Sequence, residues 1–256
     1  LNSQLPNTNI QLYQTNANEY YLVIVSHHIN IDGHSWQLLL DTLWTYYKGL
    51  DAPEEVSYMN YVNQEVLSGD IAKKNSAYWH NQLKHLPQEG WKKKHIPHIQ
   101  YEGNRAWQDL NPNTQKALNH FCQNNMLTPF MVTISIFQLL LCKQYGKLDF
   151  GITTPIAARD SLALQPIMGC CLEILTFRNP IQPNQSFMSH VTQARTTTID
   201  ALMHKKTMHC KRLGNHAAEQ TMFIYQSLPL PENTKCAPDL KYSFVEFNHL
   251  YTPLEL

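Results

Sequence analysis

A mixed α/β fold in two halves is the architecture that this sequence predicts. β-prone runs alternate with stretches whose apolar residues recur at helical spacing, and no segment repeats with a fixed period. Between residues 87 and 113 this periodicity is lost, and glycines, prolines and a run of three lysines replace it. Such mixing on both sides of an irregular segment is typical of a layered α/β domain. We therefore expect a first half over residues 1–90, a connection over 91–112 and a second half over 113–256.

The first half opens with two predicted strands, Asn9–Tyr13 and Tyr20–Val25, joined by a polar turn. The second run is continuously β-prone, which is typical of a strand buried on both faces. After a loop, one apolar stripe at helical spacing predicts a helix that Ser35 is placed to cap and Gly49 to end. The stripe consists of Trp36, Leu39, Leu40, Leu43, Trp44 and Tyr47. Two further helices are predicted over residues 58–67 and 70–86.

Helices and strands also mix in the second half. A helix predicted over residues 113–124 is followed by one that Thr128 caps, Pro129 opens and Gly146 ends. That second helix is apolar on most sides, so we expect it to be buried. The remaining predicted elements are strands over residues 148–156, 172–177, 221–226 and 240–247, and a helix over residues 187–203.

Charge and composition exclude several classes of protein. The 256 residues carry 20 Lys and Arg against 20 Asp and Glu, so the formal net charge is zero. This balance argues against nucleic-acid binding and against attraction to an anionic membrane surface. No run of apolar residues is long enough for a transmembrane helix, and the first residues lack a signal-peptide pattern. The chain begins without Met, so we expect it to be processed or to be a piece of a longer protein.

The cysteines indicate a reducing compartment. There are six of them, too few for a disulfide scaffold, and none forms a C-x-x-C pair. We expect them to be reduced thiols, mostly in the core of a cytoplasmic protein.

The densest group of reactive side chains lies in the loop from Ser26 to His34, between the second predicted strand and the first predicted helix. Loops in this position commonly carry functional residues. Because neighbouring side chains of an extended segment face opposite ways, His27 and His28 are expected to differ in role. Asp32, next to a glycine that permits a tight bend, needs a partner, and an arginine fits a carboxylate best. His34 is expected to be exposed at the entry of the helix.

This loop resembles the HHxxxDG signature of condensation domains in nonribosomal peptide synthetases, which are relatives of chloramphenicol acetyltransferase. The match is His27-His28-x-x-x-Asp32-Gly33. Four other segments resemble family motifs in the family's order. They are residues 58–61, Tyr78-Trp79 with Leu83, residues 151–159 against "vGtPvAgR", and residues 167–178 against "iGfFvNtLxxR".

The sequence also departs from the family. The motifs that precede the histidine loop and the segment that closes the domain have no counterpart here. Glu173 stands where the family usually has Asn, and residues 204–209 match the family's "HQDxPFE" only in the first histidine. The resemblance therefore implies the central portion of a two-lobed, acetyltransferase-like sandwich, with the start of lobe 1 and the end of lobe 2 absent.

The resemblance implies an enzyme that forms an amide bond between two acyl or aminoacyl thioesters, each held on the phosphopantetheine of a carrier protein. No tightly bound cofactor is expected. The expected partners are peptidyl or acyl carrier proteins, neighbouring synthetase domains and the missing parts of the same domain. The setting would be secondary metabolism, antibiotic biosynthesis above all.

The resemblance also implies roles for individual residues. His28 would stand where the two substrates meet and would accept a proton from the attacking amine or position it. His27, Asp32, Gly33 and Arg159 would shape the site. The Asp32 partner is expected to be Arg159 first, Arg178 second, or an arginine outside this chain. Backbone N–H groups near Gly33 would stabilise the oxyanion, and Glu173 would line the substrate channel.

Three alternatives remain open from the sequence. The first is epimerisation of a carrier-bound residue, since Glu173 adds a carboxylate that could move a proton. The second is a non-catalytic fragment that acts as a docking scaffold. In the third, His28 is a structural histidine. A metal site formed by His27, His28 and Asp32 is disfavoured, because adjacent histidines cannot easily bind one ion.

Overall fold

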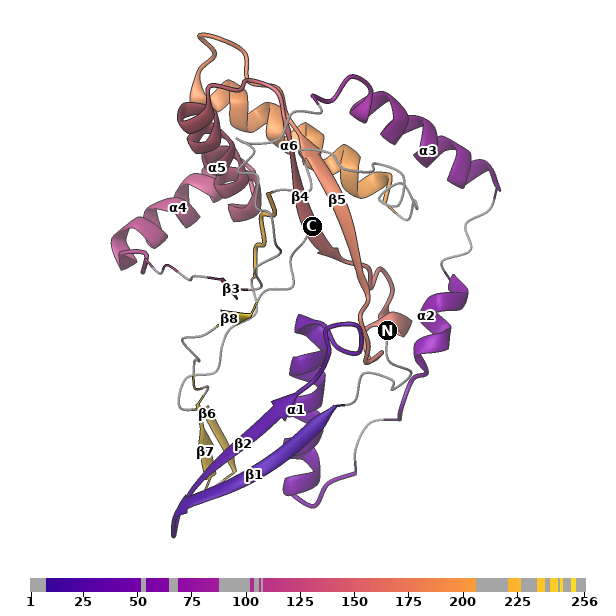
Figure 1. Cartoon of the computed structure of the whole chain (residues 1–256), viewed down its shortest axis with the longest axis vertical. Coiled ribbons are helices and arrows are strands. Elements are labelled where there is room, and N and C mark those ends of the chain that lie inside the picture. The colour runs from indigo at the N-terminus through magenta and orange to yellow at the C-terminus, as the bar shows by residue number, and fades with distance from the viewer. Residues whose placement is uncertain are drawn as a thin grey trace. The chain divides into compact units, whose positions relative to one another are not determined.

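The computed structural model describes residues 8–51, 54–64, 69–87, 102, 103, 106, 108–205, 221–226, 234–237, 240–243, 245, 250 and 251 (Figure 1). Helices and strands are mixed along the chain, as the sequence predicts. The strands are β1 (Asn9–Asn16), β2 (Glu19–Val25), β3 (Glu102–Gly103), β4 (Gly151–Ala157), β5 (Leu172–Arg178), β6 (Thr234–Ala237), β7 (Leu240–Tyr242) and β8 (Leu250–Tyr251). The helices are α1 (Gly33–Tyr47), α2 (Tyr58–Gln64), α3 (Gly69–Leu83), α4 (Pro112–Asn124), α5 (Pro129–Tyr145), the short η1 (Leu162–Leu164) and α6 (Phe187–Met203).

The chain forms two compact units that interleave in sequence. The first unit comprises Leu1–Val66, Ala157–Glu173 and Ser227–Phe244, and the second comprises Leu67–Ile156, Ile174–Gln226 and Val245–Leu256. These boundaries differ from the predicted ones, because the segment between β4 and β5 packs with the N-terminal part of the chain. The predicted division into two lobes stays a prediction. Most of the predicted connection over residues 91–112 lies outside the described residues.

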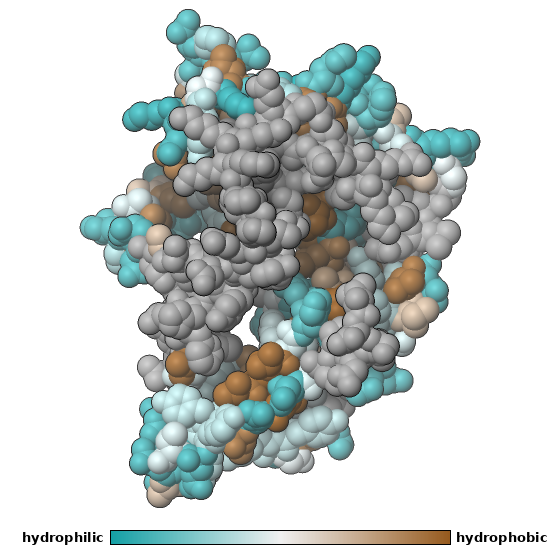
Figure 2. Space-filling view, in the orientation of Figure 1, coloured by the Kyte–Doolittle hydropathy of each residue, from teal (hydrophilic) through white to brown (hydrophobic). Residues whose placement is uncertain are grey.

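In the first unit, β1 and β2 form an antiparallel hairpin in which Ile10 is paired with Ile24 and Leu12 with Leu22. The expectation that the second strand is buried on both faces was wrong. Every residue of β1 is exposed, and in β2 only Val23 and Ile24 are half-buried. β2 pairs with β1 alone among the described residues, so no further strand covers it there. Apolar side chains gather on the surface of this hairpin (Figure 2).

The helix α1 begins three residues earlier than predicted. Asp32, not Ser35, is its N-cap, and the Asp32 carboxylate accepts a hydrogen bond from the Ser35 N–H. Ser35 lies in the first turn instead. At the other end Lys48 is the C-cap, and Gly49 follows with a φ of 70°, as a glycine after a helix commonly does. The predicted end of the helix is thus confirmed.

The second unit contains a helical layer in which α5 packs against both α4 and α6. The ends of α5 are as predicted. The Thr128 hydroxyl accepts from the Met131 N–H, and Gly146 adopts the left-handed conformation. Burial of α5 is less complete than expected, because Ile136 and Leu140 are half-exposed. Its buried face consists of Met131, Val132, Ile134, Ser135 and Gln138.

The predicted strands and helices of the rest of the chain fit with adjusted ends. β4 and β5 form a two-stranded sheet, and the expected strand over residues 221–226 is only an isolated parallel bridge between Met222 and Thr153. α2 and α3 replace the helices expected over 58–67 and 70–86. Residues 65–68 lie outside the described part. β7 covers only the start of the strand expected over residues 240–247.

Among the described helices none is long and apolar enough by itself to cross a membrane; α4 and α5 pass such a test only together, with a bend of 110° between them.

Arg178 fastens the end of α3 to β5 in the second unit. Its guanidinium donates to both Asp149 oxygens, at 2.8 and 2.5 Å, and its Nη1 donates to the carbonyls of Gln82 and Lys84 at 2.8 and 2.9 Å. The Gln82 side chain donates in return to the Arg178 carbonyl. The hydrogen bonds to Asp149 raise the pKa of Arg178 above its usual value.

Replacing Arg178 with Lys is therefore expected to destabilise the second unit. A lysine keeps the charge but is a point donor that cannot reach Asp149 and two carbonyls together. Hydrogen bonds to charged groups contribute about 1.5–3 kcal/mol, so the loss is expected to be of that size. Urea unfolding of R178K is the measurement, and a midpoint equal to that of the unmodified chain would contradict this role.

His190 is a buried histidine of α6 whose Nδ1 lies 2.9 Å from the Gln185 side-chain nitrogen. Burial lowers the pKa of His190 from its ordinary value of 6.5. The neutral ring therefore suits the folded state, and the unfolded state takes up the proton first as the pH falls. Stability from this group is present above about pH 6.5 and is lost as the pH falls below it.

We expect the free energy of unfolding to fall between pH 6.5 and pH 5 by up to about 1.4 kcal/mol per pH unit from this residue. A His190→Gln variant, which keeps a polar side chain but does not titrate, should show a flatter dependence over that range. Urea unfolding at each pH measures both. Parallel curves for the two proteins would show that His190 does not titrate as described.

Candidate active site

The loop between β2 and α1 is a turn in the first unit, not the extended segment that the sequence suggested. The carbonyl of His27 accepts from the Asn30 N–H at 2.9 Å, and the His27 Nδ1 accepts from the Ile29 N–H at 3.1 Å. The His27 ring thus bonds to the backbone of its own loop. The rings of His27 and His28 are both exposed. That His28 faces a channel stays a prediction.

Asp32 and Arg159 form a buried ion pair that anchors this loop. The side chains are 1% and 2% exposed, respectively. Contact is bidentate, from Nη1 to Oδ2 at 2.7 Å and from Nη2 to Oδ1 at 3.1 Å. Of the two arginines that the sequence offered as partners, Arg159 is the one used, whereas Arg178 pairs with Asp149.

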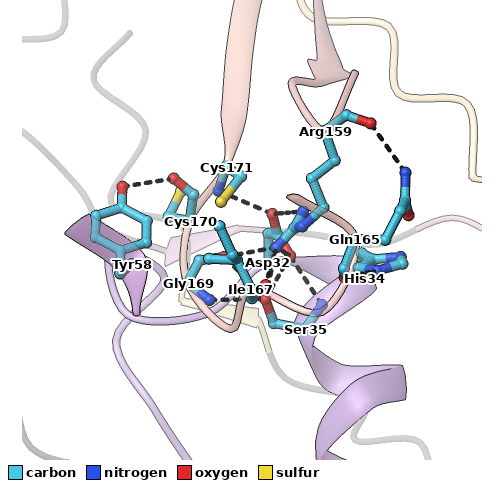
Figure 3. Close-up of polar contacts among 10 residues, drawn as sticks. All are labelled: Asp32, His34, Ser35, Tyr58, Arg159, Gln165, Ile167, Gly169, Cys170 and Cys171. Carbon is cyan, nitrogen blue, oxygen red and sulfur yellow. Dashed lines mark hydrogen bonds and ion pairs between the residues drawn. The ribbon is translucent and has the colours of Figure 1, made fainter. Parts of the chain in front are cut away.

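Further donors surround the Asp32 carboxylate (Figure 3). The N–H and hydroxyl of Ser35 reach Oδ1 at 2.9 and 2.8 Å, and the Cys171 N–H reaches Oδ2 at 3.0 Å. Burial opposes ionisation of Asp32, but the hydrogen bonds from Arg159, Ser35 and Cys171 outweigh it and hold the pKa of Asp32 below its ordinary value. Asp32 is therefore a charged structural group.

Arg159 also ties the segment between β4 and β5 to the same point. Its Nη2 lies 3.0 Å from the Ile167 carbonyl and 3.1 Å from the Gly169 carbonyl, and the Gln165 side chain donates to the Arg159 carbonyl. Its Nε, in contrast, is buried without a hydrogen-bond partner in the described part of the chain. Both terminal nitrogens of the guanidinium thus have hydrogen-bond partners, whereas Nε has none among the described residues.

A tight turn at Gly169 closes the network. Gly169 has a φ of 154°, which side-chain-bearing residues rarely adopt, and a β-carbon there would overlap the ring of Tyr58. The Tyr58 hydroxyl donates to the Cys170 carbonyl at 3.0 Å. Ile167 and Cys171, on either side of this turn, belong to an apolar cluster with Tyr61, Ala158 and Leu164.

Gly33 and His34 differ from their predicted states. Gly33 is the first residue of α1 and does not take a positive φ. The glycine that the site needs for its backbone is Gly169. His34 is half-buried rather than exposed, and its Nε2 lies 2.9 Å from the Gln165 carbonyl. An exposed helix entry was expected only because the sequence does not show that η1 and Gln165 pack there.

Glu173 is half-buried on β5, two residues beyond Cys171. Its place in a substrate channel stays a prediction. In the part of the chain that the structure describes, no group of three or more His, Cys, Asp and Glu side chains is arranged to hold a metal ion. Sequence reasoning missed the roles of Ser35, Gly169 and Tyr58 in this network, although two of them lie in segments that resemble family motifs.

Comparison with known proteins identifies the family to which this chain belongs. The family model of the condensation domain matches residues 1–250, so the chain belongs to that family. A linear gramicidin synthase of Brevibacillus parabrevis is 28% identical over 244 residues, which cover 86% of this chain and 5% of that protein. Surfactin synthase subunit 1 of Bacillus subtilis (strain 168) is 27% identical over 276 residues, covering 99% of this chain and 7% of that protein.

Solved structures of the same fold agree with this assignment. SgcC5 of Streptomyces globisporus aligns with a TM-score of 0.78 at 20% identity, over 96% of this chain and 60% of that one. The first condensation domain of the calcium-dependent antibiotic synthetase aligns with a TM-score of 0.66 at 18% identity, over 85% of this chain and 53% of that one. The chain thus has the predicted condensation-domain fold and spans little more than half of these structures.

An Asp32→Asn substitution is expected to cause misfolding or insolubility. The amide keeps the shape but leaves the Arg159 charge buried and unmatched, which typically costs about 3–5 kcal/mol. Because the pKa of Asp32 is lowered, the contribution is present above the ordinary pKa of 3.8 and is lost as the pH falls toward the lowered value. Soluble yield and urea unfolding at pH 7 measure the effect.

Asp41→Asn is the matched control, because Asp41 is an exposed residue of the same helix. It should change the unfolding midpoint little. A soluble D32N protein with the midpoint of D41N would contradict the structural role of the pair.

A Gly169→Ala substitution is expected to destabilise the first unit for two reasons, backbone strain and overlap with Tyr58. Combining it with Tyr58→Ala should relieve the overlap but not the strain. The penalty for G169A should therefore be smaller, but not zero, in the Y58A background, as a double-mutant cycle of unfolding free energies would measure. Equal penalties in both backgrounds would show that the contact with Tyr58 is not the cause.

Proposed function

We propose that this chain carries the central part of an active site that joins two carrier-bound substrates through an amide bond. The observation that carries the proposal is the exposed ring of His28 on a loop that the Asp32–Arg159 pair pins, in a chain that belongs to the condensation-domain family. The nonribosomal synthetases among its relatives support the choice of substrates.

In the proposed reaction, the amine of the acceptor attacks the thioester carbonyl of the donor. The carbon–nitrogen bond forms, the carbon–sulfur bond breaks, and the donor carrier leaves with a free phosphopantetheine thiol. His28 accepts the proton that the amine loses, or holds the amine in line and lets the leaving thiolate take it. General-base catalysis contributes about 10²- to 10⁴-fold to a rate, and positioning alone also accelerates.

The surrounding residues support this reaction by fixing the loop. The His27 ring accepts a hydrogen bond from the Ile29 N–H and so stabilises the turn. The ion pair between Asp32 and Arg159 holds the end of the loop against the segment before β5. We propose that backbone N–H groups at the start of α1, near Gly33, face the oxyanion, because a helix N-terminus favours negative charge. Glu173 is proposed to line the channel, and carrier proteins are the proposed partners.

The test is an amide-forming assay with a panel of carrier proteins, each loaded with one aminoacyl group. Pairs of loaded carriers would be mixed with the full chain, and with the chain completed by its flanking sequence, and mass spectrometry would detect the dipeptidyl carrier. His28→Ala is expected to lower the rate of product formation at least 100-fold. His120→Ala, which removes an exposed histidine of α4, is the matched control and should leave the rate unchanged.

Other outcomes decide against the proposal. Racemised donor without amide product would instead support epimerisation, and a Glu173→Gln variant should then lose that activity. If folded protein forms neither an amide nor a racemised donor with any pair of loaded carriers, the chain would be a docking scaffold. Product that forms equally well without the His28 ring would overturn the role given to that residue.

A further inference from the structure

Ser35 occupies the centre of the network yet has no role in the proposed chemistry. The residue is fully buried, in the first turn of α1. Its hydroxyl lies 2.8 Å from the Asp32 Oδ1, 3.0 Å from the Arg159 Nη2, 2.8 Å from the Gly169 carbonyl and 3.0 Å from the Gly169 N–H (Figure 3). One oxygen therefore contacts both backbone polar groups of a residue 134 positions away in sequence.

The capacity of a hydroxyl decides which of these contacts matter most. A hydroxyl donates one hydrogen and accepts two. The Gly169 N–H and the Arg159 Nη2 are donors, so they occupy the two acceptor positions. The single hydrogen of Ser35 then goes either to Asp32 or to the Gly169 carbonyl.

The partners differ in how far they depend on this hydroxyl. Without it, the Asp32 carboxylate still receives Arg159, the Ser35 N–H and the Cys171 N–H. The Gly169 carbonyl still receives the Arg159 Nη2 and the Cys171 N–H. The Gly169 N–H, by contrast, has the Ser35 oxygen as the acceptor that the structure records for it. Gly169 is itself buried, so water is no ready substitute.

From this we infer that Ser35 is a positioning residue: its hydroxyl holds the Gly169 turn against the first turn of α1 and so fixes the spacing between the histidine loop and the start of β5. The effect of Ser35 on catalysis rests on the proposed condensation function, whereas its effect on the Gly169 turn does not. His28 precedes α1 on one side of this contact, and Glu173 follows the Gly169 turn on the other. Asp32 supplies the charge that holds Arg159, whereas Ser35 sets the distance.

The first test is hydrogen exchange of individual backbone amides, followed by NMR in the full chain. The Gly169 amide should be protected in the unmodified protein, and Ser35→Ala should lower its protection at least tenfold. The Cys171 amide, which donates to Asp32 and to the Gly169 carbonyl but not to Ser35, should change less than threefold. Thr45→Ala is the matched control, since it removes a hydroxyl that donates within α1, to the Asp41 carbonyl.

Equal loss at Gly169 and Cys171 would show general destabilisation and overturn the inference, as would a Gly169 amide that exchanges freely in the unmodified protein. If the alanine variant does not fold, Ser35→Thr retains the hydroxyl and should fold with Gly169 still protected. A folded threonine variant whose Gly169 amide exchanges freely would show that the hydroxyl is not the cause.

The second test is kinetic and uses the loaded-carrier assay. A positioning residue that touches no substrate should affect the reacting geometry more than binding. Ser35→Ala is expected to lower kcat at least tenfold with KM changed less than twofold, while Thr45→Ala changes neither. An unchanged kcat in folded S35A protein would overturn the inference. An unmodified chain that forms no amide would overturn the proposed function, and the exchange of Gly169 would then decide the role of Ser35 alone.

Discussion

The ion pair between Asp32 and Arg159 is the interaction on which the described part of the site depends. It connects two segments separated by 127 residues, and both side chains are almost completely buried. Removing two charges from water is costly, and the cost is met only when geometry is good and the remaining donors and acceptors are used. Here the carboxylate receives Arg159, Ser35 and Cys171, so its side of the pair is fully satisfied.

The arginine side shows why a guanidinium is needed. Its two terminal nitrogens face the Asp32 carboxylate, the Ser35 hydroxyl and the carbonyls of Ile167 and Gly169. A lysine at the same position would offer one nitrogen and could not reach both carboxylate oxygens and the turn together. The pair is therefore as much a geometric device as an electrostatic one. It joins the N-cap of α1 to the segment before β5.

The ion pair and α5 could be predicted from sequence because the signals are local or chemically specific. The acid after the β-prone run needs a partner that an arginine fits best, and the segment that ends at Arg159 resembles a family motif. Thr128, Pro129 and Gly146 are strong end signals for α5, and the structure confirms them. The resemblance likewise predicted the family, which the match over residues 1–250 confirms.

The rest depended on contacts that a sequence does not display. The β-prone run of β2 predicts a strand but does not show how many strands flank it. The prediction that β2 is buried on both faces was therefore wrong. Asp32 and Ser35 are both residue types that cap helices, and only the structure shows that Asp32 does so while Ser35 turns to Gly169. Backbone partners such as Gly169 carry no side-chain signal at all. The position of His28 relative to a substrate is likewise not displayed by the sequence, so its catalytic role is a proposal.

The dependence of the fold on the ion pair can be measured with a double-mutant cycle between Asp32 and Arg159. The free energies of unfolding of Asp32→Asn, Arg159→Gln and the double variant would be compared with that of the unmodified chain by urea titration at pH 7. Each single variant leaves one buried group unmatched, whereas the double variant leaves two neutral amides. We expect a coupling energy of about 1–3 kcal/mol, so that the double variant is more stable by that amount than the sum of the two single losses implies. Losses that add to within about 0.5 kcal/mol would contradict it, because they would show that the two residues act independently.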